Sequence, residues 1–362
     1  MITNMTLDEI ILLRLYNQQI SHNPSKSPED VVSWMGAIQA QDYAGAKWSL
    51  GLRLPHSREA DIDEAIARRA IVRTWPMRGT LHFVAADDVR WMLKLLTPRI
   101  ISGSAGRNRQ LELDETIFNK SHDLLIRAME GGKQLMRSEV YAILENADIT
   151  TAGQRGIHII NYLAQKQVLC HGVHNEKQPT YALLDEWIPV SKNLEGKEAL
   201  AELALRYFKS HGPATLNDFV WWSGLRISDA KDGLNAVLPM LERIEFDGKM
   251  YWVEAGRPEI NAGQSIFLLP GFDEYMIGYT DRTLILEAQH AGKIVPGNNG
   301  MFMPTIVVDG KVKGLWKRIP KKDKISIEIS PFEKFTKAKI KLITTEAKKY
   351  GNYLGRSVSL ID

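Results

Sequence analysis

Two glutamines, Gln39 and Gln41, stand one residue apart in the stretch WMGAIQAQDYAGAKWSLGLR, which spans residues 34–53. Each side-chain amide offers an acceptor oxygen and two N–H donors, and none of these properties changes with pH near neutrality. A pair of such amides can hold a water molecule or place acceptor dipoles beside a developing positive charge. The alternative is an ordinary polar turn whose amides satisfy nearby backbone groups.

The two side chains can serve one site only if the backbone that carries them is not helical. Residues i and i+2 point to different faces of an α-helix, whereas they share a side of an extended segment. The stretch SPEDVVSWMGAI has a capping serine, a proline in the first turn and acids after it, which predicts a helix from Ser27 to about Ala37. We therefore expect residues 38–42 to be extended or irregular, with Gly36 and Gly45 permitting the change.

Helical periodicity followed by a hairpin signal occurs three times along the chain. In the first round, helical patterns at residues 7–20, 27–37 and 58–72 precede two short strands within residues 73–84, and a helix over 86–96 follows. The order of three helices and a hairpin is that of a winged helix. It returns within residues 114–184 and within residues 197–254, where the Asp247-Gly248 pair is a strong hairpin signal.

Beyond Pro258 the pattern changes from helical to alternating. The segments at residues 265–279, 302–316, 324–330 and 337–343 alternate apolar and polar residues between turn sequences, which predicts strands, and the chain from Tyr350 onward is a short tail or a final strand. We therefore predict an α+β protein with three tandem winged-helix units followed by an antiparallel β-barrel-like C-terminal domain. The expected boundaries are 1–110, 111–192, 193–258 and 259–362.

Composition places the chain among reduced, globular proteins. The one cysteine, Cys170, rules out an intramolecular disulfide, and neither a signal-peptide core nor an apolar run long enough to span a membrane occurs. We expect a cytoplasmic monomer. The net charge of +3 is uneven, because residues 311–349 carry 13 Lys and Arg against four Asp and Glu. Such an excess fits a polyanionic partner or a solvated Lys-rich face.

Four blocks of sequence carry a family resemblance that covers nearly the whole chain: AIQAQDYAGAKWSLGLR, RTWPMRGTLHFV, LLPGFDEYMIGYTDR and FMPTIVVDGKVKGLWKR. Together they resemble the winged-helix DNA-binding family that includes the AlkZ and YcaQ DNA glycosylases. The resemblance implies three winged helices closed by a β-barrel, and excision of alkylated purines, including those in interstrand crosslinks. The activity of the family goes with a glutamine, an apolar residue and then glutamine or aspartate, which here are Gln39, Ala40 and Gln41.

The implied substrate fits the chemistry of neutral amides. A purine alkylated at N7 or N3 carries a positive charge, so its bond to the sugar breaks without a general acid, unlike the ordinary glycoside, which needs two carboxylates. What remains is to place a water and to stabilise an oxocarbenium-like sugar, which Gln39 and Gln41 can do as catalytic residues. No lysine suited to a lyase step stands near them, so we expect a monofunctional glycosylase.

Candidate DNA contacts come from cations on the first predicted hairpin and from the Gly/Ser-rich linker at residues 102–110. Wing cations can reach a phosphate or the minor groove, and a basic pair in a linker can grip the backbone. Each candidate also has an interpretation without DNA contact. The hairpin arginines can be ordinary surface charge, the histidine can be half-buried in the hairpin, and the linker can be a plain flexible connection. The candidates are Arg73, Arg78, His82, Arg107 and Arg109.

Other features of the sequence indicate neither metal nor cofactor. Cys170, His171 and His174 lack a fourth ligand at zinc-site spacing, and no phosphate-cradling glycine loop or nucleophile elbow occurs. Asp273, Glu274 and Asp281 could make an acid pair, although Asp281 with Arg282 is more simply a turn or an ion pair. We predict no metal and no cofactor.

Three functions remain open from the sequence. The first is a repair glycosylase on double-stranded DNA with alkylated bases or crosslinks, nucleoid-associated when bound. The second is a non-catalytic winged-helix DNA-binding protein or transcription regulator, which would bind intact and alkylated DNA equally. The third is a protein-interaction array without affinity for DNA.

Overall fold

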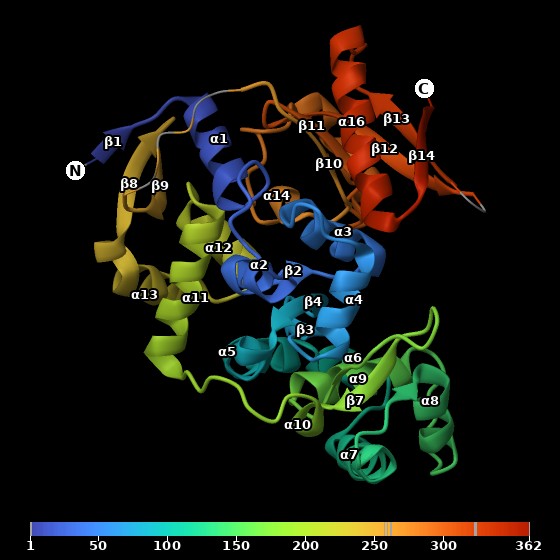
Figure 1. Ribbon diagram of the computed structural model, residues 1–362. Helices are drawn as coiled ribbons and strands as arrows, with labels where there is room; N and C mark the ends of the chain where they lie inside the picture. The colour runs from blue at the N-terminus through green and yellow to red at the C-terminus, as the bar shows by residue number, and fades with distance from the viewer. Residues whose placement is uncertain (1, 257, 259, 261–262, 322–323, 362) are drawn as a thin grey trace. The chain divides into compact units, whose positions relative to one another are not determined.

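The structure is a computed structural model that describes residues 2–256, 258, 260, 263–321 and 324–361 (Figure 1). The chain forms two compact units. Unit 1 comprises Met1–Ile62, Ala201–Trp222 and Arg226–Asp362, and unit 2 comprises Asp63–Leu200 and Ser223–Leu225. Among the described residues no helix combines the length and the apolar character that a bilayer crossing requires.

Three helices and one short strand make up the N-terminal part of unit 1. They are α1 (Leu7–Asn17), α2 (Pro28–Met35), β2 (Ile38–Gln39) and α3 (Tyr43–Arg53). α1 and α2 each begin with a capping box, in which Thr6 and Ser27 accept from the backbone three residues ahead. α3 had no assignment in the sequence analysis, because two glycines interrupt its apolar pattern. α4 (Glu59–Ala67) follows.

Unit 2 contains the first two hairpins. Its strands follow one another in the sheet in the order β4-β3-β6-β7-β5, with antiparallel pairing throughout. Buried residues of its helices, among them Phe118, Leu125, Leu144 and Ile160, form the core with Trp75 of β3. The elements are β3 (Ile71–Met77), β4 (Thr80–Ala85), η1 (Ala86–Asp88), α5 (Val89–Gly103), α6 (Ala105–Gln110), α7 (Glu115–Met129), β5 (Leu135–Met136), α8 (Arg137–Glu145), α9 (Arg155–Gln165), β6 (Leu169–His171), β7 (Thr180–Leu183) and α10 (Leu184–Trp187).

The prediction that residues 102–110 form a Gly/Ser-rich linker is wrong, as is the alternative of a plain flexible linker. α5 continues to Gly103 and α6 begins at Ala105, so the basic pair lies on a helix.

The third helical round is followed by a hairpin, as predicted. Its elements are α11 (Gly196–His211), α12 (Leu216–Ser223), α13 (Ile227–Val237), η2 (Leu238–Met240), β8 (Leu241–Phe246) and β9 (Lys249–Glu254). Asp247 and Gly248 both take positive φ values at the turn, as a tight hairpin requires. The N-terminal strand β1 (Ile2–Asn4) pairs parallel to β8, which gives a three-stranded sheet in the order β1-β8-β9.

The C-terminal part of unit 1 is built on a curled half-barrel of five strands in the order β10-β11-β12-β13-β14. It is not wholly antiparallel, because the final strand β14 pairs parallel to β13. Figure 1 shows α16 beside these strands. The elements are β10 (Ile266–Leu269), α14 (Glu274–Ile277), η3 (Ala288–His290), α15 (Ala291–Ile294), η4 (Pro296–Asn298), β11 (Thr305–Val308), β12 (Lys311–Pro320), β13 (Lys324–Pro331), α16 (Lys337–Leu354) and β14 (Ser357–Ile361).

Two strand predictions in this part are wrong. Residues 337–343 alternate like a strand but begin α16, because the buried positions Ile343, Ala347 and Tyr350 continue at helical spacing past the end of the window. Within residues 265–279 only β10 is a strand, since Asp273 caps the short helix α14.

Candidate functional site

The glutamine pair lies between α2 and α3. Gly36 ends α2 with a φ of +79°, a left-handed conformation that favours glycine. The short strand β2 follows, and a bend at Gln41 and Asp42 leads into α3. The prediction that residues 38–42 are extended or irregular is therefore confirmed.

The two glutamines have different surroundings. Gln39 is 9% exposed and Ala40 is fully buried, whereas Gln41 is exposed. A buried amide keeps its hydrogen-bond partners within the protein, and an exposed amide can exchange water for another molecule. Gln41 is thus the member of the pair that an incoming molecule can reach directly.

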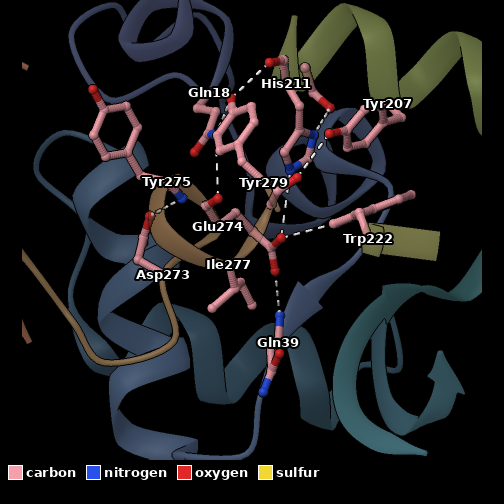
Figure 2. A network of polar contacts seen from close by, with 12 residues as sticks. Gln18, Gln39, Tyr207, His211, Trp222, Asp273, Glu274, Tyr275, Ile277 and Tyr279 are labelled. Atoms are coloured by element: carbon pink, nitrogen blue, oxygen red, sulfur yellow. Dashed lines mark hydrogen bonds and ion pairs between the residues drawn. The ribbon is translucent and has the colours of Figure 1, made fainter. Parts of the chain in front are cut away.

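Glu274, the first residue of α14, holds the backbone of this segment through a hydrogen bond. Its Oε1 accepts from the backbone N–H of Gln39 at 2.9 Å, and its Oε2 accepts from the indole N–H of Trp222 at 3.0 Å (Figure 2). The carboxylate is fully buried. Donors on both oxygens offset part of the cost of removing it from water. The motif backbone is therefore tied to a side chain from the C-terminal part of unit 1.

His211 lies on the other side of this carboxylate. Its Nε2 is 3.5 Å from Oε2 of Glu274, and its Nδ1 is 2.8 Å from Oγ of Ser210. Burial lowers the pKa of His211 below its usual value, although the nearby Glu274 opposes that shift. The imidazole is accordingly neutral at pH 7, and its ring stacks on Tyr207 with the centroids 4.8 Å apart.

A buried ion pair anchors the residue before Glu274. Asp273 accepts from Nη1 of Arg53 at 2.9 Å and from Nη2 at 3.0 Å, and both side chains are fully buried. Burial alone would raise the pKa of Asp273, but the Arg53 guanidinium and hydrogen bonds from Ser49 and Tyr275 hold that pKa below its usual value. The helix α3, which follows the glutamines, is therefore joined to the residue that precedes Glu274, the side chain that bonds to the backbone of Gln39.

A layer of neutral polar groups completes the network in Figure 2. Gln18 donates to the hydroxyl of Tyr279 at 3.0 Å, and that hydroxyl donates to the backbone carbonyl of His211 at 2.7 Å. Tyr207 donates to the carbonyl of Gly278 at 2.8 Å. These bonds hold α1, α11 and α14 together around Glu274.

The structure separates the acids that the sequence analysis grouped. Asp273 pairs with Arg53, and Asp281 pairs with Lys249 at 2.6 Å instead of with Arg282. Glu274 alone reaches the motif segment. The supporting roles of Glu274, Trp222 and His211 were missed, because no local spacing links these positions to Gln39.

The hairpin candidates for DNA contact lie in unit 2. Arg73 is 8% exposed and His82 is fully buried, whereas Arg78 at the turn is half-buried. Nη2 of Arg78 lies 3.3 Å from Nε2 of His82, so these two candidates are brought together. Arg78 is the most accessible hairpin cation of the three.

The linker candidates are also in unit 2, on α6. Arg107 and Arg109 are both exposed. Nη2 of Arg107 donates to the side-chain oxygen of Gln154 at 2.9 Å. Both cations are thus presented to solvent by the same short helix.

The cysteine, the neighbouring histidine and most of the tryptophans near the motif are buried in the protein interior. Cys170 and His171 are buried on β6, and burial lowers the pKa of His171 well below its usual value. Trp48, Trp75 and Trp91 are almost fully buried. Among the residues that the structure describes, no group of three or more His, Cys, Asp and Glu side chains could hold a metal ion.

Comparisons with known proteins agree with this architecture. The profile of the family described as "DNA glycosylase AlkZ-like" matches residues 32–353. The chain is 24% identical over 357 residues to the "Interstrand DNA cross-link repair glycosylase" of Streptomyces sahachiroi, covering 94% of each protein. The solved structure of Streptomyces sahachiroi DNA glycosylase AlkZ superposes with a TM-score of 0.83 at 21% identity, covering 99% of this chain and 100% of the other.

Proposed function

The chain belongs to the AlkZ-like DNA glycosylase family, and from this premise we propose that it is a monomeric, monofunctional DNA repair glycosylase of the cytoplasm, nucleoid-associated when bound to DNA. It hydrolyses the N-glycosidic bond of purines alkylated at N7 or N3 in double-stranded DNA, crosslinked purines included. The observation that carries this proposal is the bond from Glu274 to the backbone of Gln39, which holds a non-helical glutamine segment in place. A fixed backbone is what preorganised amide dipoles need.

In the proposed reaction the exposed amide of Gln41 holds the attacking water. The nearly buried amide of Gln39 supplies an acceptor dipole for the positive charge that develops on the sugar. The bond electrons pass to the alkylated base, which leaves as a neutral purine, so no proton donor is required; the proton that the attacking water loses as it bonds to the sugar passes to solvent. Neither Glu274 nor the neutral His211 acts on the substrate in this scheme, because both are fully buried.

We infer that the three rounds of helices and hairpin act as winged-helix units on DNA. Their expected ranges are 1–110, 111–192 and 193–258, with the β-rich domain at 259–362. Arg78, Arg107 and Arg109 contact phosphates, because these cations are at least partly exposed. Arg73 and His82 support the hairpin from within: His82 is fully buried, and Arg73 is 8% exposed on a strand whose residues are all buried.

The test is base release from a duplex with a single N7-methylguanine and from a duplex with an N7-linked crosslink. Alkali-labile abasic sites are expected with the wild-type protein and not with a Gln39→Ala, Gln41→Ala double variant. Gln289→Ala is the control, because Gln289 is an exposed glutamine outside the network. Equal activity of the double variant would remove the mechanism. Binding to both duplexes without any base release would indicate the non-catalytic DNA-binding protein.

A further inference from the structure

Part of the lysine excess in residues 311–349 is neutralised within the protein. On β12, Nζ of Lys311 lies 3.6 Å from Oδ1 of Asp8, and Nζ of Lys313 lies 2.6 Å from Oε1 of Glu287. Such exposed pairs add little to stability, but they lower the positive potential that these lysines present to a partner. The charge that remains available for a polyanion therefore lies elsewhere in this segment.

The helix α16 carries lysines that are not neutralised. It packs against β10 and β14 through buried residues such as Ile343, and its outer face carries three exposed lysines at positions i, i+4 and i+11. This spacing places them on one side of the helix. None of the three forms an ion pair with a residue that the structure describes. They are Lys337, Lys341 and Lys348.

The size and the charge of this face suit a phosphate backbone. The three lysines extend over about 16 Å of the helix axis, at about 1.5 Å per residue. One strand of DNA presents a phosphate roughly every 3.4 Å along its axis, so several phosphates lie within reach of the face. Of the 18 residues of α16, all of which the structure describes, only Glu346 is acidic, and it pairs with Lys349 at 2.7 Å. No unpaired carboxylate of the helix opposes a phosphate there.

A cavity of about 830 Å³ lies at the C-terminal end of this face, between α16 and the chain that follows α3. Two of its lining residues, Arg58 and Arg356, are exposed and form no ion pair with the described part of the chain. The other charged pair in its lining, Glu346 and Lys349, is self-neutralising. The unpaired charge in the cavity is therefore positive.

Arg318 connects α16 to the glutamine segment. Its Nη1 donates to the hydroxyl of Tyr350 on α16 at 3.2 Å, and its Nη2 lies 3.8 Å from Oδ1 of Asp42. Asp42 directly follows Gln41, the exposed member of the glutamine pair. The helix α16 is therefore close to the segment that the proposed function places against DNA.

We propose that the outer face of α16, with Arg58 and Arg356 at its C-terminal end, binds the phosphate backbone of duplex DNA outside the lesion. The proposed function supplies the identity of the polyanion, and the exposed, unpaired cations supply the contact. The Lys-rich segment then holds a partner instead of forming only a solvated face.

The test is fluorescence anisotropy with an undamaged, labelled duplex at several chloride concentrations. Each lost phosphate contact lowers the slope of log affinity against log salt by about 0.9, so a Lys341→Gln, Lys348→Gln double variant should lower it by about 2. Its Kd at a fixed salt concentration should rise about tenfold. The matched control is Lys311→Gln, Lys313→Gln, which removes two charges from the same segment but from paired lysines. The control should keep a slope near that of wild type.

The proposal is overturned if the Lys341, Lys348 variant binds the duplex as wild type does, or if the control loses as much affinity, since total charge would then explain the effect. Binding to vesicles that contain phosphatidylserine, without binding to the duplex, would assign the face to an anionic membrane and would also overturn it. Base release is a separate measurement. A glycosylase whose duplex binding ignores Lys341 and Lys348 loses only this surface, whereas an inactive protein whose binding depends on them loses only the proposed function.

Discussion

The carboxylate of Glu274 accepts a hydrogen bond of 2.9 Å from the backbone N–H of Gln39, although 235 positions of sequence separate the two residues. The same carboxylate accepts from Trp222 through its other oxygen. One buried side chain thereby connects the glutamine segment, α12 and α14.

Replacing Glu274 by glutamine should lower kcat for base release about tenfold or more and leave KM for the duplex nearly unchanged. Two N–H donors face the two oxygens of Glu274, whereas a glutamine amide offers only one acceptor oxygen, so one donor loses its partner. The free energy of unfolding should fall by about 1–3 kcal/mol. Single-turnover kinetics and urea denaturation measure the two effects.

Trp222→Phe is the matched control for Glu274→Gln. It removes the other donor and leaves the bond to Gln39 in place, so stability should fall while kcat changes much less. Equal losses of kcat in the two variants would show that Glu274 has only a general structural role.

The different exposure of the two glutamines predicts different effects of their removal. Gln41→Ala should abolish most base release without a change in stability beyond about 0.5 kcal/mol, because Gln41 is exposed. Gln39→Ala should abolish base release and also lower stability by about 1 kcal/mol, because Gln39 is nearly buried. Thermal unfolding alongside the N7-methylguanine assay measures both. Wild-type activity in either single variant would contradict the proposal that both glutamines take part in base release.

Gly36→Ala should reduce both stability and base release. Gly36 has a φ of +79°, and an added Cβ would lie 3.2 Å from the Trp222 ring, so the turn before the motif would shift. A cost of about 1–2 kcal/mol is expected from the backbone strain. Gly355→Ala is the control, since its φ of +63° brings similar strain and its Cβ would meet nothing within 4 Å. That control should lose stability and keep full activity.

The Arg53–Asp273 pair predicts a pH-dependent part of the stability. The pKa of Asp273 lies below its ordinary value of 3.8 in the folded protein, so the folded state holds this proton more weakly than the unfolded state. The stabilisation is complete above the unfolded pKa and is lost as the pH falls through the lower folded pKa. Asp273→Asn should therefore cost about 3–5 kcal/mol at pH 7, and this difference from wild type should shrink below a pH of about 4.

Denaturant unfolding of wild type and Asp273→Asn from pH 3 to pH 7 measures this difference. Asp8→Asn serves as the control, because Asp8 is exposed and lies 3.6 Å from Lys311. Its cost should stay below about 1 kcal/mol at every pH. A difference for Asp273→Asn that does not vary with pH would contradict the assigned pKa direction.

Local signals in the sequence were sufficient for many of the elements. The capping box at Ser27 and the glycine at position 36 give the bounds of α2, and the Asp247-Gly248 pair gives the β8–β9 hairpin. Such features depend on residues within a few positions of one another, so the chain specifies them without its tertiary contacts. The non-helical backbone at Gln39 follows from the same kind of signal.

Predictions from short sequence windows were wrong where the hydrophobic periodicity fitted both a helix and a strand, or where the packing partner lay outside the window. Residues 337–343 fit both a strand and a helix, and packing of Ile343, Ala347 and Tyr350 decided for α16. The parallel pairing of β14 with β13 likewise depends on how α16, which separates the two strands in the chain, crosses back over the sheet.

By itself the sequence determined the non-helical glutamine segment, the three helices and the hairpin of the third round, and the resemblance that led to the AlkZ-like family. Only the tertiary structure decided that Glu274 holds the backbone of Gln39, that Arg53 neutralises Asp273, and that Trp222 donates to the same Glu274 carboxylate. The physical reason is that hydrogen bonds and burial depend on distance in space, and a local sequence pattern carries no information about which remote segment will supply the partner.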